Sequence, residues 1–264
     1  MRSSTRSCAA SAGEIAGHGN HPGADAGEPG TVRAVTDDEQ TAPASDTGET
    51  PIADWLGGLA RSTGSPGGGA AAAVMLGIAA GLTSMVVGYS SAEGDDEAAA
   101  LEGLSARAGE LRARALQLAD EDSVSSAAFG AAFALPKGTE REEAISTASV
   151  EAAGSSAAVG DAALGAIDDL EWLAEHGNRA LIADVAVACG AARAAITGAR
   201  TNVSFDLASL AATGSTLDDV RERHPELWSA AQRLDEGLRR IDELSSRFDH
   251  RAAPTVHHDT GASD

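Results

Sequence analysis

Aromatic side chains and lysine are scarce in this chain of 264 residues. Aromatic residues make up 3% of the sequence although hydrophobic residues make up 43%, so most of the apolar content is Ala, Val and Leu. Lys137 is the single lysine. Small apolar side chains let helix axes approach closely. The composition therefore predicts tightly packed helices rather than a core built around aromatic rings.

The chain also has fewer basic residues than a nucleic-acid-binding protein would need. Its 19 Lys and Arg residues face 40 Asp and Glu residues, which gives a net charge of −21. Affinity for nucleic acids comes largely from basic side chains that neutralise phosphates, and no basic stripe occurs here. We therefore expect no nucleic-acid partner. A negatively charged substrate would need a local pocket of cations or helix N-termini.

Several familiar site motifs are missing. Cys8 and Cys189 form neither a disulfide framework nor a metal signature, and the histidines lack metal-ligand spacing, so we expect no metal and no bound cofactor. The S-P-G-G-G-A segment at 65–70 lacks the Gly-Lys-Ser/Thr of a phosphate-binding loop. The first residues contain no apolar signal core, which favours a cytoplasmic location.

Composition divides the chain into three parts. Residues 1–50 and 249–264 are rich in small and acidic residues and poor in large apolar groups. Such segments bury too little apolar surface to offset the entropy cost of ordering. We predict disordered tails over 1–50 and 249–264, with one folded domain over 51–248.

The spacing of apolar residues predicts six helices, and no segment shows strand alternation. A T-E-R-E sequence that resembles a capping box opens the fourth helix at Thr139. Helices of these lengths predict an all-α, elongated bundle with long central helices. The expected ranges are 51–61, 70–91, 95–134, 139–176, 179–212 and 216–247.

The segment 70–91 contains no charged residue. Gly77, Gly81, Ser84 and Gly88 fall on one helical face, which predicts a groove for a close neighbouring helix. Its length also allows a membrane span. Ala and Gly insert weakly and no Lys or Arg cluster flanks the segment, which favours a central helix buried on all sides.

Three local patterns carry groups suited to chemistry, and the first is the glycine loop before this helix. Gly67, Gly68 and Gly69 let the backbone approach a ligand closely, and the helix N-terminus adds free N–H donors. The alternative is a tight turn between two helices.

The second pattern is Asp184 within the apolar run 181–188. The run predicts that this carboxyl is buried, and burial without a cation raises a carboxyl pKa toward neutrality, which suits proton transfer. The alternative is an aspartate on the solvent face of its helix.

The third pattern is the polar segment 201–206 on the same expected helix. Asn202 follows Asp184 by five helical turns, so both side chains face the same way but lie roughly 27 Å apart if the helix is continuous. One chain therefore does not bring them into one small pocket. Antiparallel copies in a dimer would bring the two groups together.

Four segments resemble, in their order and spacing, segments of the cyclodeaminase/cyclohydrolase family. They are SPGGGAAAA, LADED with ALPKGTEREE, GNRALIADVAVA, and GARTNVSFDLASL, and the resemblance covers about residues 52–247. This family includes the deaminase half of formiminotransferase-cyclodeaminase and the stand-alone methenyltetrahydrofolate cyclohydrolases. The resemblance implies an all-helical homodimer without metal, acting on a tetrahydrofolate derivative.

The resemblance also implies roles for individual residues. Asp184 matches the family's acid and is implied to be catalytic. Lys137 is implied to meet the glutamate tail of folate, and the alternative is a solvated loop lysine. The residues implied to bind substrate are Gly67, Gly68, Gly69, Asp122, Lys137, Asn178, Asn202 and Asp206.

The chain departs from the family's pattern at three positions. Ala183 stands for a serine, Ser126 for an aromatic residue, and Asp206 for an asparagine. These departures support an alternative reading, a non-catalytic helical paralogue that binds folate or a partner. A membrane-associated helical protein built around 70–91 is a third hypothesis.

The leading hypothesis is an enzyme acting on the N5–C–N10 unit of tetrahydrofolate. Cyclodeamination closes a formimino group to the methenyl bridge with loss of ammonia, and cyclohydrolysis opens that bridge with water. No formiminotransferase domain is present in this sequence, which favours the cyclohydrolase.

Overall fold

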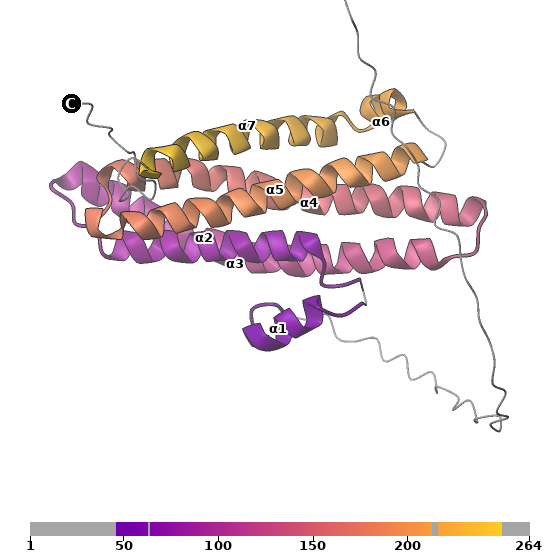
Figure 1. Cartoon of the computed structure of the whole chain (residues 1–264), viewed down its shortest axis with the longest axis horizontal. Helices are drawn as coiled ribbons and strands as arrows, with labels where there is room; N and C mark the ends of the chain where they lie inside the picture. Colours follow the sequence, from indigo (N-terminus) through magenta and orange to yellow (C-terminus); the bar gives the residue numbers. More distant parts are fainter. Residues whose placement is uncertain (1–45, 63, 213–215, 250–264) are drawn as a thin grey trace, which may run out of the picture. The chain divides into compact units, whose positions relative to one another are not determined.

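The structure, a computed structural model, describes residues 46–62, 64–212 and 216–249, which form a helical bundle (Figure 1). The described residues contain seven α-helices, one short 3-10 helix and no strand, which confirms the predicted all-α class. The elements are α1 (Ile52–Leu59), α2 (Gly68–Gly88), α3 (Asp95–Ala134), α4 (Thr139–His176), η1 (Arg179–Leu181), α5 (Ile182–Ala212), α6 (Leu217–Arg223) and α7 (Pro225–Asp249).

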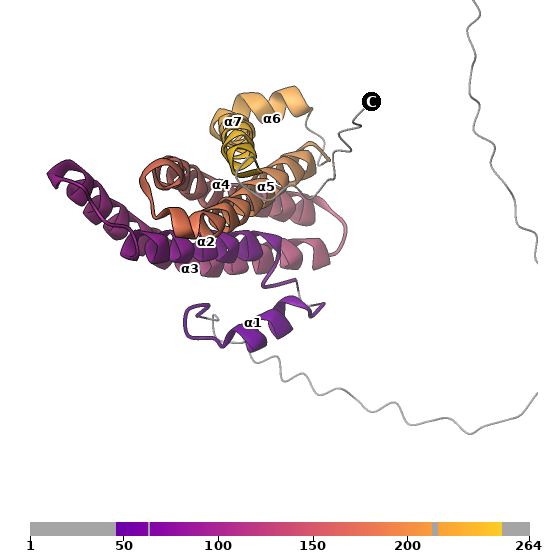
Figure 2. The same cartoon turned by 60° about the vertical axis from the view of Figure 1, so that its left-hand side comes forward.

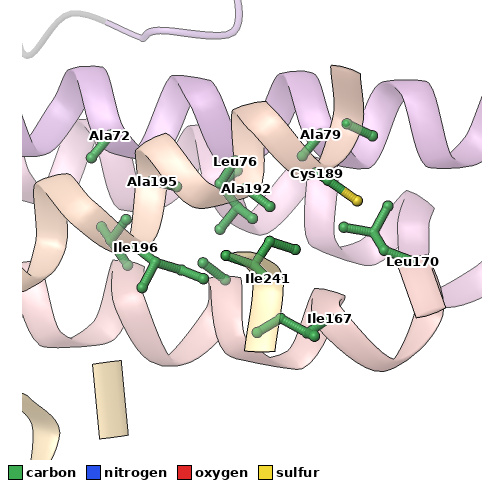
Figure 3. Packing of buried hydrophobic residues seen from close by; sticks show 14 of the residues in the cluster. Ala72, Leu76, Ala79, Ile167, Leu170, Cys189, Ala192, Ala195, Ile196 and Ile241 are labelled. Carbon is green, nitrogen blue, oxygen red and sulfur yellow. The ribbon is translucent and has the colours of Figure 1, made fainter. Parts of the chain in front are cut away.

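Four long helices build the centre of the bundle. Each of α2, α3, α4 and α5 packs on the next, and α2 also packs on α5, so the four enclose a common core. Helix α7 lies along α4 and α5 (Figures 1 and 2). Leu76 of α2, Ile167 and Leu170 of α4, Ile196 of α5 and Ile241 of α7 meet in this core (Figure 3).

Small residues set the distance between α2 and α5, as the composition predicts. A Cβ placed on Gly198 of α5 would lie 2.8 Å from the Cβ of Ala72 on α2, which is too close for two carbons. The predicted small-residue groove of α2 is only partly used within the chain. A Cβ on Gly77 would lie 3.6 Å from Ala115, whereas Gly81 and Gly88 face open space.

Helix α2 is not buried on all sides, which corrects the prediction for this segment. Met75, Ile78 and Met85 are exposed on its outer face. Gly68–Gly88 and Arg179–Ala211 are the two described segments that are long and apolar enough to cross a membrane by length and composition. Half of the most apolar stretch of α2 is buried inside the bundle.

The sixth predicted helix is two helices, which brings the count to seven. Its apolar spacing continues from Leu217 to Leu244, but the chain breaks at His224, where φ is −129° and ψ is 57°. Proline offers no backbone N–H, and it disfavours helical geometry in the residue before it. Pro225 therefore ends α6 and begins α7.

The predicted capping box at Thr139 is absent. Gly138 is the N-cap of α4, no side chain bonds to it, and Thr139 is already inside the helix. A capping box instead opens α6, where the Thr216 and Asp219 side chains bond to each other's backbone N–H groups.

The structure describes residues 46–50, which the sequence prediction assigns to the N-terminal tail. Residues 46–50 form a turn, and the Thr47 N–H and hydroxyl donate to the Asp120 carboxylate of α3 at 2.9 and 2.6 Å. The boundary predicted for the disordered N-terminal tail is therefore too late. The rest of both predicted tails, 1–45 and 250–264, lies outside the described residues.

Candidate functional site

A buried carboxylate from α3 meets the glycine-rich start of α2. The Ala70 N–H donates to Asp122 Oδ2 at 2.8 Å, and the Ser126 hydroxyl donates to the same oxygen at 3.3 Å. Asp122 is 4% exposed. Its negative charge lies where the unpaired N–H groups and the dipole of α2 are most favourable to an anion.

Gly69 is required by this arrangement. A Cβ at position 69 would overlap the Asp122 carboxyl group, with Oδ2 only 2.7 Å away. The loop before α2 is also held against α3, because the Ser65 hydroxyl donates to the Ser123 carbonyl of α3 at 2.8 Å. Gly64 has φ of +82°, a conformation that favours glycine. The glycines therefore allow α2 to begin directly against α3.

Helix α5 supplies two further polar groups one turn apart. The Asn202 side-chain oxygen lies 3.9 Å from the position of a Cβ on Gly68, and Asp206 follows on the same face. These groups line a cavity of about 290 Å³. The residues that line it are Gly64, Gly67, Gly68, Gly69, Asp122, Ser126, Phe129, Gly130, Ala152, Ser156, Asn202 and Asp206.

The two carboxyl groups of the cavity differ electrostatically. Burial, and then the negative charge of Asp122, raise the pKa of Asp206 to about 7. Burial also raises the pKa of Asp122, but the hydrogen bonds from Ala70 and Ser126 oppose that rise. Environments that separate two carboxyl groups in this way are typical of acid and base pairs.

The structure brings together most of the residues that the sequence implicates. Gly67, Gly68 and Gly69 come from α2 and the residue before it, and Asp122 comes from α3. Asn202 and Asp206 come from α5. All of them line the one cavity.

Lys137 does not line the cavity. It is exposed in the turn between α3 and α4, beyond the end of α3 that carries Gly130. Arg141 lies in the first turns of α4, with its guanidinium 5.8 Å from the centre of the Phe133 ring. Two cations therefore occupy the α3–α4 end of the bundle, and neither belongs to the residues that line the cavity.

Asp184 lies at the other end of α5. It is in the first turn of the helix and is half-buried, so the prediction of a buried carboxyl is wrong. Neighbours in sequence do not enclose it, since Ala183 and Val187 are exposed. Because α5 is one continuous helix, Asp184 and Asn202 are about 27 Å apart within one chain, as the spacing predicts.

Asn178 holds the α4–α5 turn in place. Its backbone N–H donates to the Ser90 hydroxyl at 3.0 Å, and its Nδ2 donates to the Tyr89 carbonyl at 2.8 Å. Its side-chain oxygen accepts from the Ala180 N–H at 3.0 Å. These bonds give Asn178 a structural role, which is to hold the α4–α5 turn against the end of α2, at the end of the bundle away from the cavity.

The sequence interpretation missed several residues of the cavity. Ser126, Phe129 and Gly130 follow Asp122 at helical spacing, so a search of the Asp122 face for neighbours four, seven and eight positions on would have found them. Ala152 and Ser156 of α4 have no comparable signal, because only the packing of α4 on α3 and α5 brings them there.

Comparisons with known proteins agree with this fold. A sequence profile of the formiminotransferase-cyclodeaminase family matches residues 51–222, a range that contains every residue lining the cavity. A methenyltetrahydrofolate cyclohydrolase from Methylorubrum extorquens is 34% identical over 166 residues, which span 59% of this chain and 78% of that protein.

A solved structure is similar in fold. The formiminotetrahydrofolate cyclodeaminase from Thermotoga maritima aligns with a TM-score of 0.62 and 22% identity, covering 76% of this chain and 98% of that one. The profile match spans well over half of the chain, and the cyclohydrolase relative is matched over most of its length. The chain belongs to the formiminotransferase-cyclodeaminase family.

Proposed function

We propose that this protein is a methenyltetrahydrofolate cyclohydrolase. In this reaction a water oxygen bonds to the carbon that bridges N5 and N10. The N5–C bond then breaks, its electron pair goes to N5, which takes a proton, and one further proton is released with 10-formyltetrahydrofolate. Each step moves a proton at nitrogen or oxygen, which a positioned carboxylate can accept or return.

The observation that carries this proposal is the cavity at the start of α2. It combines two carboxyl groups, an amide and backbone N–H groups, and it lies within the part of the chain that matches the family. The 34% identity to a cyclohydrolase favours that reaction. A formiminotetrahydrofolate cyclodeaminase is the second candidate, because the family includes this activity and the same bridging carbon reacts.

We further propose that the protein is a homodimer that pairs through α2 and α5. Helix α2 contains no charged residue, and Met75, Ile78 and Met85 are exposed on it. The adjacent helix α5 exposes Val187 and Phe205, which are 59% and 72% accessible. In a chain with a net charge of −21, an uncharged face of this kind is typical of an interface.

A second copy is the occupant that this face fits best. Gly81 and Gly88 of α2 face open space within the chain, so a partner helix can approach the backbone closely there. A two-fold axis across α5 would place the two copies of that helix antiparallel. The Asp184 end of one copy would then lie beside the Asn202 end of the other.

This dimer would complete the site with a catalytic carboxylate. Asp184 keeps its proposed role as the acid–base group, supplied by one copy to the cavity of the other. The cavity of each copy would hold the folate through the glycine loop, Asp122, Asn202 and Asp206. Lys137 would meet the glutamate tail, since from Gly130 only about 6 Å of helix leads to the end of α3.

The first experiment follows the loss of the near-ultraviolet absorbance of 5,10-methenyltetrahydrofolate, with the uncatalysed hydrolysis subtracted. Acceleration by the wild-type protein supports the cyclohydrolase. Without acceleration, ammonia release from formiminotetrahydrofolate would identify the cyclodeaminase. Tight folate binding without either reaction would identify a non-catalytic paralogue, and it would direct attention to Ala183, Ser126 and Asp206.

A second experiment tests whether each site is shared between two copies. At a folate concentration well below the weakened affinity of Asn202→Ala, we expect this variant and Asp184→Asn each to be nearly inactive alone, while co-expression restores activity in mixed dimers. Half of random dimers are mixed and each has one intact site, so about a quarter of wild-type activity should return. A mixture that stays inactive would mean that Asp184 of one copy and Asn202 of the other do not form a shared site.

The proposed location is the cytoplasm, where a soluble folate enzyme would act. The competing membrane hypothesis predicts that the protein needs detergent for extraction, because α2 would then cross a bilayer. Recovery of the full chain from a detergent-free lysate supernatant, as a species of twice the chain mass, would support the soluble dimer.

A further inference from the structure

The cavity holds two carboxyl groups and no balancing cation. Asp122 enters from α3 and Asp206 from α5, while every other side chain that lines the cavity is neutral. From α2 come only glycines, and from α4 come Ala152 and Ser156. This charge pattern is unfavourable for an anionic group and favourable for a cation.

The neighbouring cations do not line the cavity: Lys137 is exposed in the α3–α4 turn, and the Arg141 guanidinium lies 5.8 Å from the centre of the Phe133 ring. On α5, the closest cation to Asp206 in sequence is Arg200, which pairs with Asp235 of α7 at 2.8 Å and donates to Ser204 at 2.8 Å. The α6 and α7 side of this part of α5 packs through apolar residues such as Leu207. Asp122 is therefore the charged group that acts on Asp206 from the elements around it.

The two carboxyl groups are held very differently. Asp122 accepts hydrogen bonds from the Ala70 N–H and the Ser126 hydroxyl. Within the described part of the chain, no donor bonds to Asp206, and its pKa is raised to about 7 by burial and by Asp122. A cationic ligand beside this half-buried carboxylate would stabilise its ionised form.

We propose that Asp206 makes the cavity selective for the cationic amidinium form of the one-carbon group over forms in which this group is neutral. The inference rests on the proposed folate chemistry. The methenyl bridge carries a positive charge shared between N5 and N10, and the formyl group of the product is neutral. An amide at this position, as in the family pattern noted above, would bind both forms without regard to charge.

Selectivity of this kind depends on pH with a definite sign. Ionised Asp206 attracts the cation, so kcat/KM for 5,10-methenyltetrahydrofolate should rise about tenfold between about pH 6 and about pH 8. The bound cation stabilises the ionised carboxyl and lowers its pKa. The kcat value should therefore change less than kcat/KM over the same interval.

The test compares wild-type protein with Asp206→Asn and with Asp161→Asn, which removes a surface carboxylate paired with Arg233. Initial rates on 5,10-methenyltetrahydrofolate are measured by stopped flow across this pH interval. The competitor 5-formyltetrahydrofolate, whose one-carbon group is neutral, gives an inhibition constant for each protein. We expect Asp206→Asn to lose the rise in kcat/KM, to fall about tenfold at about pH 8, and to keep the inhibition constant. Asp161→Asn should match the wild type.

The outcomes separate the inference from the function on which it rests. Wild-type turnover with a flat kcat/KM profile would overturn the inference and leave the cyclohydrolase standing. So would an Asp206→Asn protein that retains the rise, or one that binds the cation and the competitor more weakly to an equal extent. A wild-type protein that does not accelerate loss of the methenyl bridge would overturn the proposed function, and the inference with it.

Discussion

The two ends of α5 carry the same residue type in different surroundings. Asp206 lines a cavity beside Asp122, and burial and that neighbour raise its pKa to about 7. Asp184, about 33 Å away along the helix, is half-buried in the first turn, where the helix dipole favours an anion. The comparison teaches that the elements packed around a carboxylate, rather than its apolar neighbours in sequence, determine how far it is buried and how much free energy its ionisation costs.

The largest expected effect comes from the Asp184 end. We expect Asp184→Asn to lower turnover by at least about a hundredfold, since a proposed acid–base group is lost. The residue is half-exposed, so the free energy of unfolding should change by less than about 0.5 kcal/mol. Loss of methenyl absorbance and the thermal midpoint measure the two quantities.

Asp161→Asn is the matched control for this change. It removes one acidic charge from the surface of α4 and should leave the rate unchanged. A full rate in Asp184→Asn would remove Asp184 from the mechanism. The carboxyl groups at the Asp206 end would then have to supply the proton transfer alone.

The next effect concerns the packing that builds the cavity end. Gly69→Ala places a methyl group against the Asp122 carboxyl, so we expect a loss of about 1–3 kcal/mol in stability together with folate binding. Gly165→Ala, at an exposed position of α4 with open space around it, should stabilise the protein by about 0.5–1 kcal/mol. Urea unfolding measures both, and equal behaviour of the two variants would contradict the proposed close contact.

Local signals predicted much of the fold. The observed limits of α3 and α4 are those expected, because charged first turns and the Pro136–Gly138 break mark them in the sequence. The break at Pro225 was missed because apolar spacing continues across it. The backbone constraint of Pro225 therefore interrupts the helix, although the apolar periodicity continues across it.

The site was less predictable than the fold. Family resemblance implicated Gly69 and Asp122, but contact between residues so distant in sequence follows only from the packing of α2 on α3. Asp184 was expected to be buried because its sequence neighbours are apolar. Those neighbours lie around the whole helix, and Val187 among them is exposed. Sequence alone does not say which face of a helix meets a partner.

A smaller effect separates the two asparagines near the ends of α5. We expect Asn178→Ala to cost about 1–2 kcal/mol of stability, because it leaves the Tyr89 carbonyl and the Ala180 N–H without their partner. Folate affinity should be preserved in the variant that remains folded. Asn202→Ala should do the reverse, with weaker folate binding and little change in unfolding. Calorimetric titration measures the folate affinity of both variants, and urea unfolding measures their stability. Weaker folate binding in Asn178→Ala, or a loss of stability in Asn202→Ala, would contradict these roles.

The smallest expected effect returns to Asp206 and to stability rather than rate. Its pKa is 3.8 in an ordinary setting and about 7 in the folded chain, so the folded state binds a proton that the unfolded state releases. The free energy of unfolding therefore falls as pH rises from about 4 to about 7. Asp206→Asn should remove this penalty and gain about 1 kcal/mol at about pH 8 after solvent screening, or about 2–4 °C in thermal midpoint. At about pH 4 the two proteins should converge, because the carboxyl is then protonated in the folded state. An equal gain at both pH values would attribute the effect to packing. A gain confined to high pH, in the variant that also loses its preference for the cation, would mean that this end of α5 keeps a destabilising charge for the sake of binding.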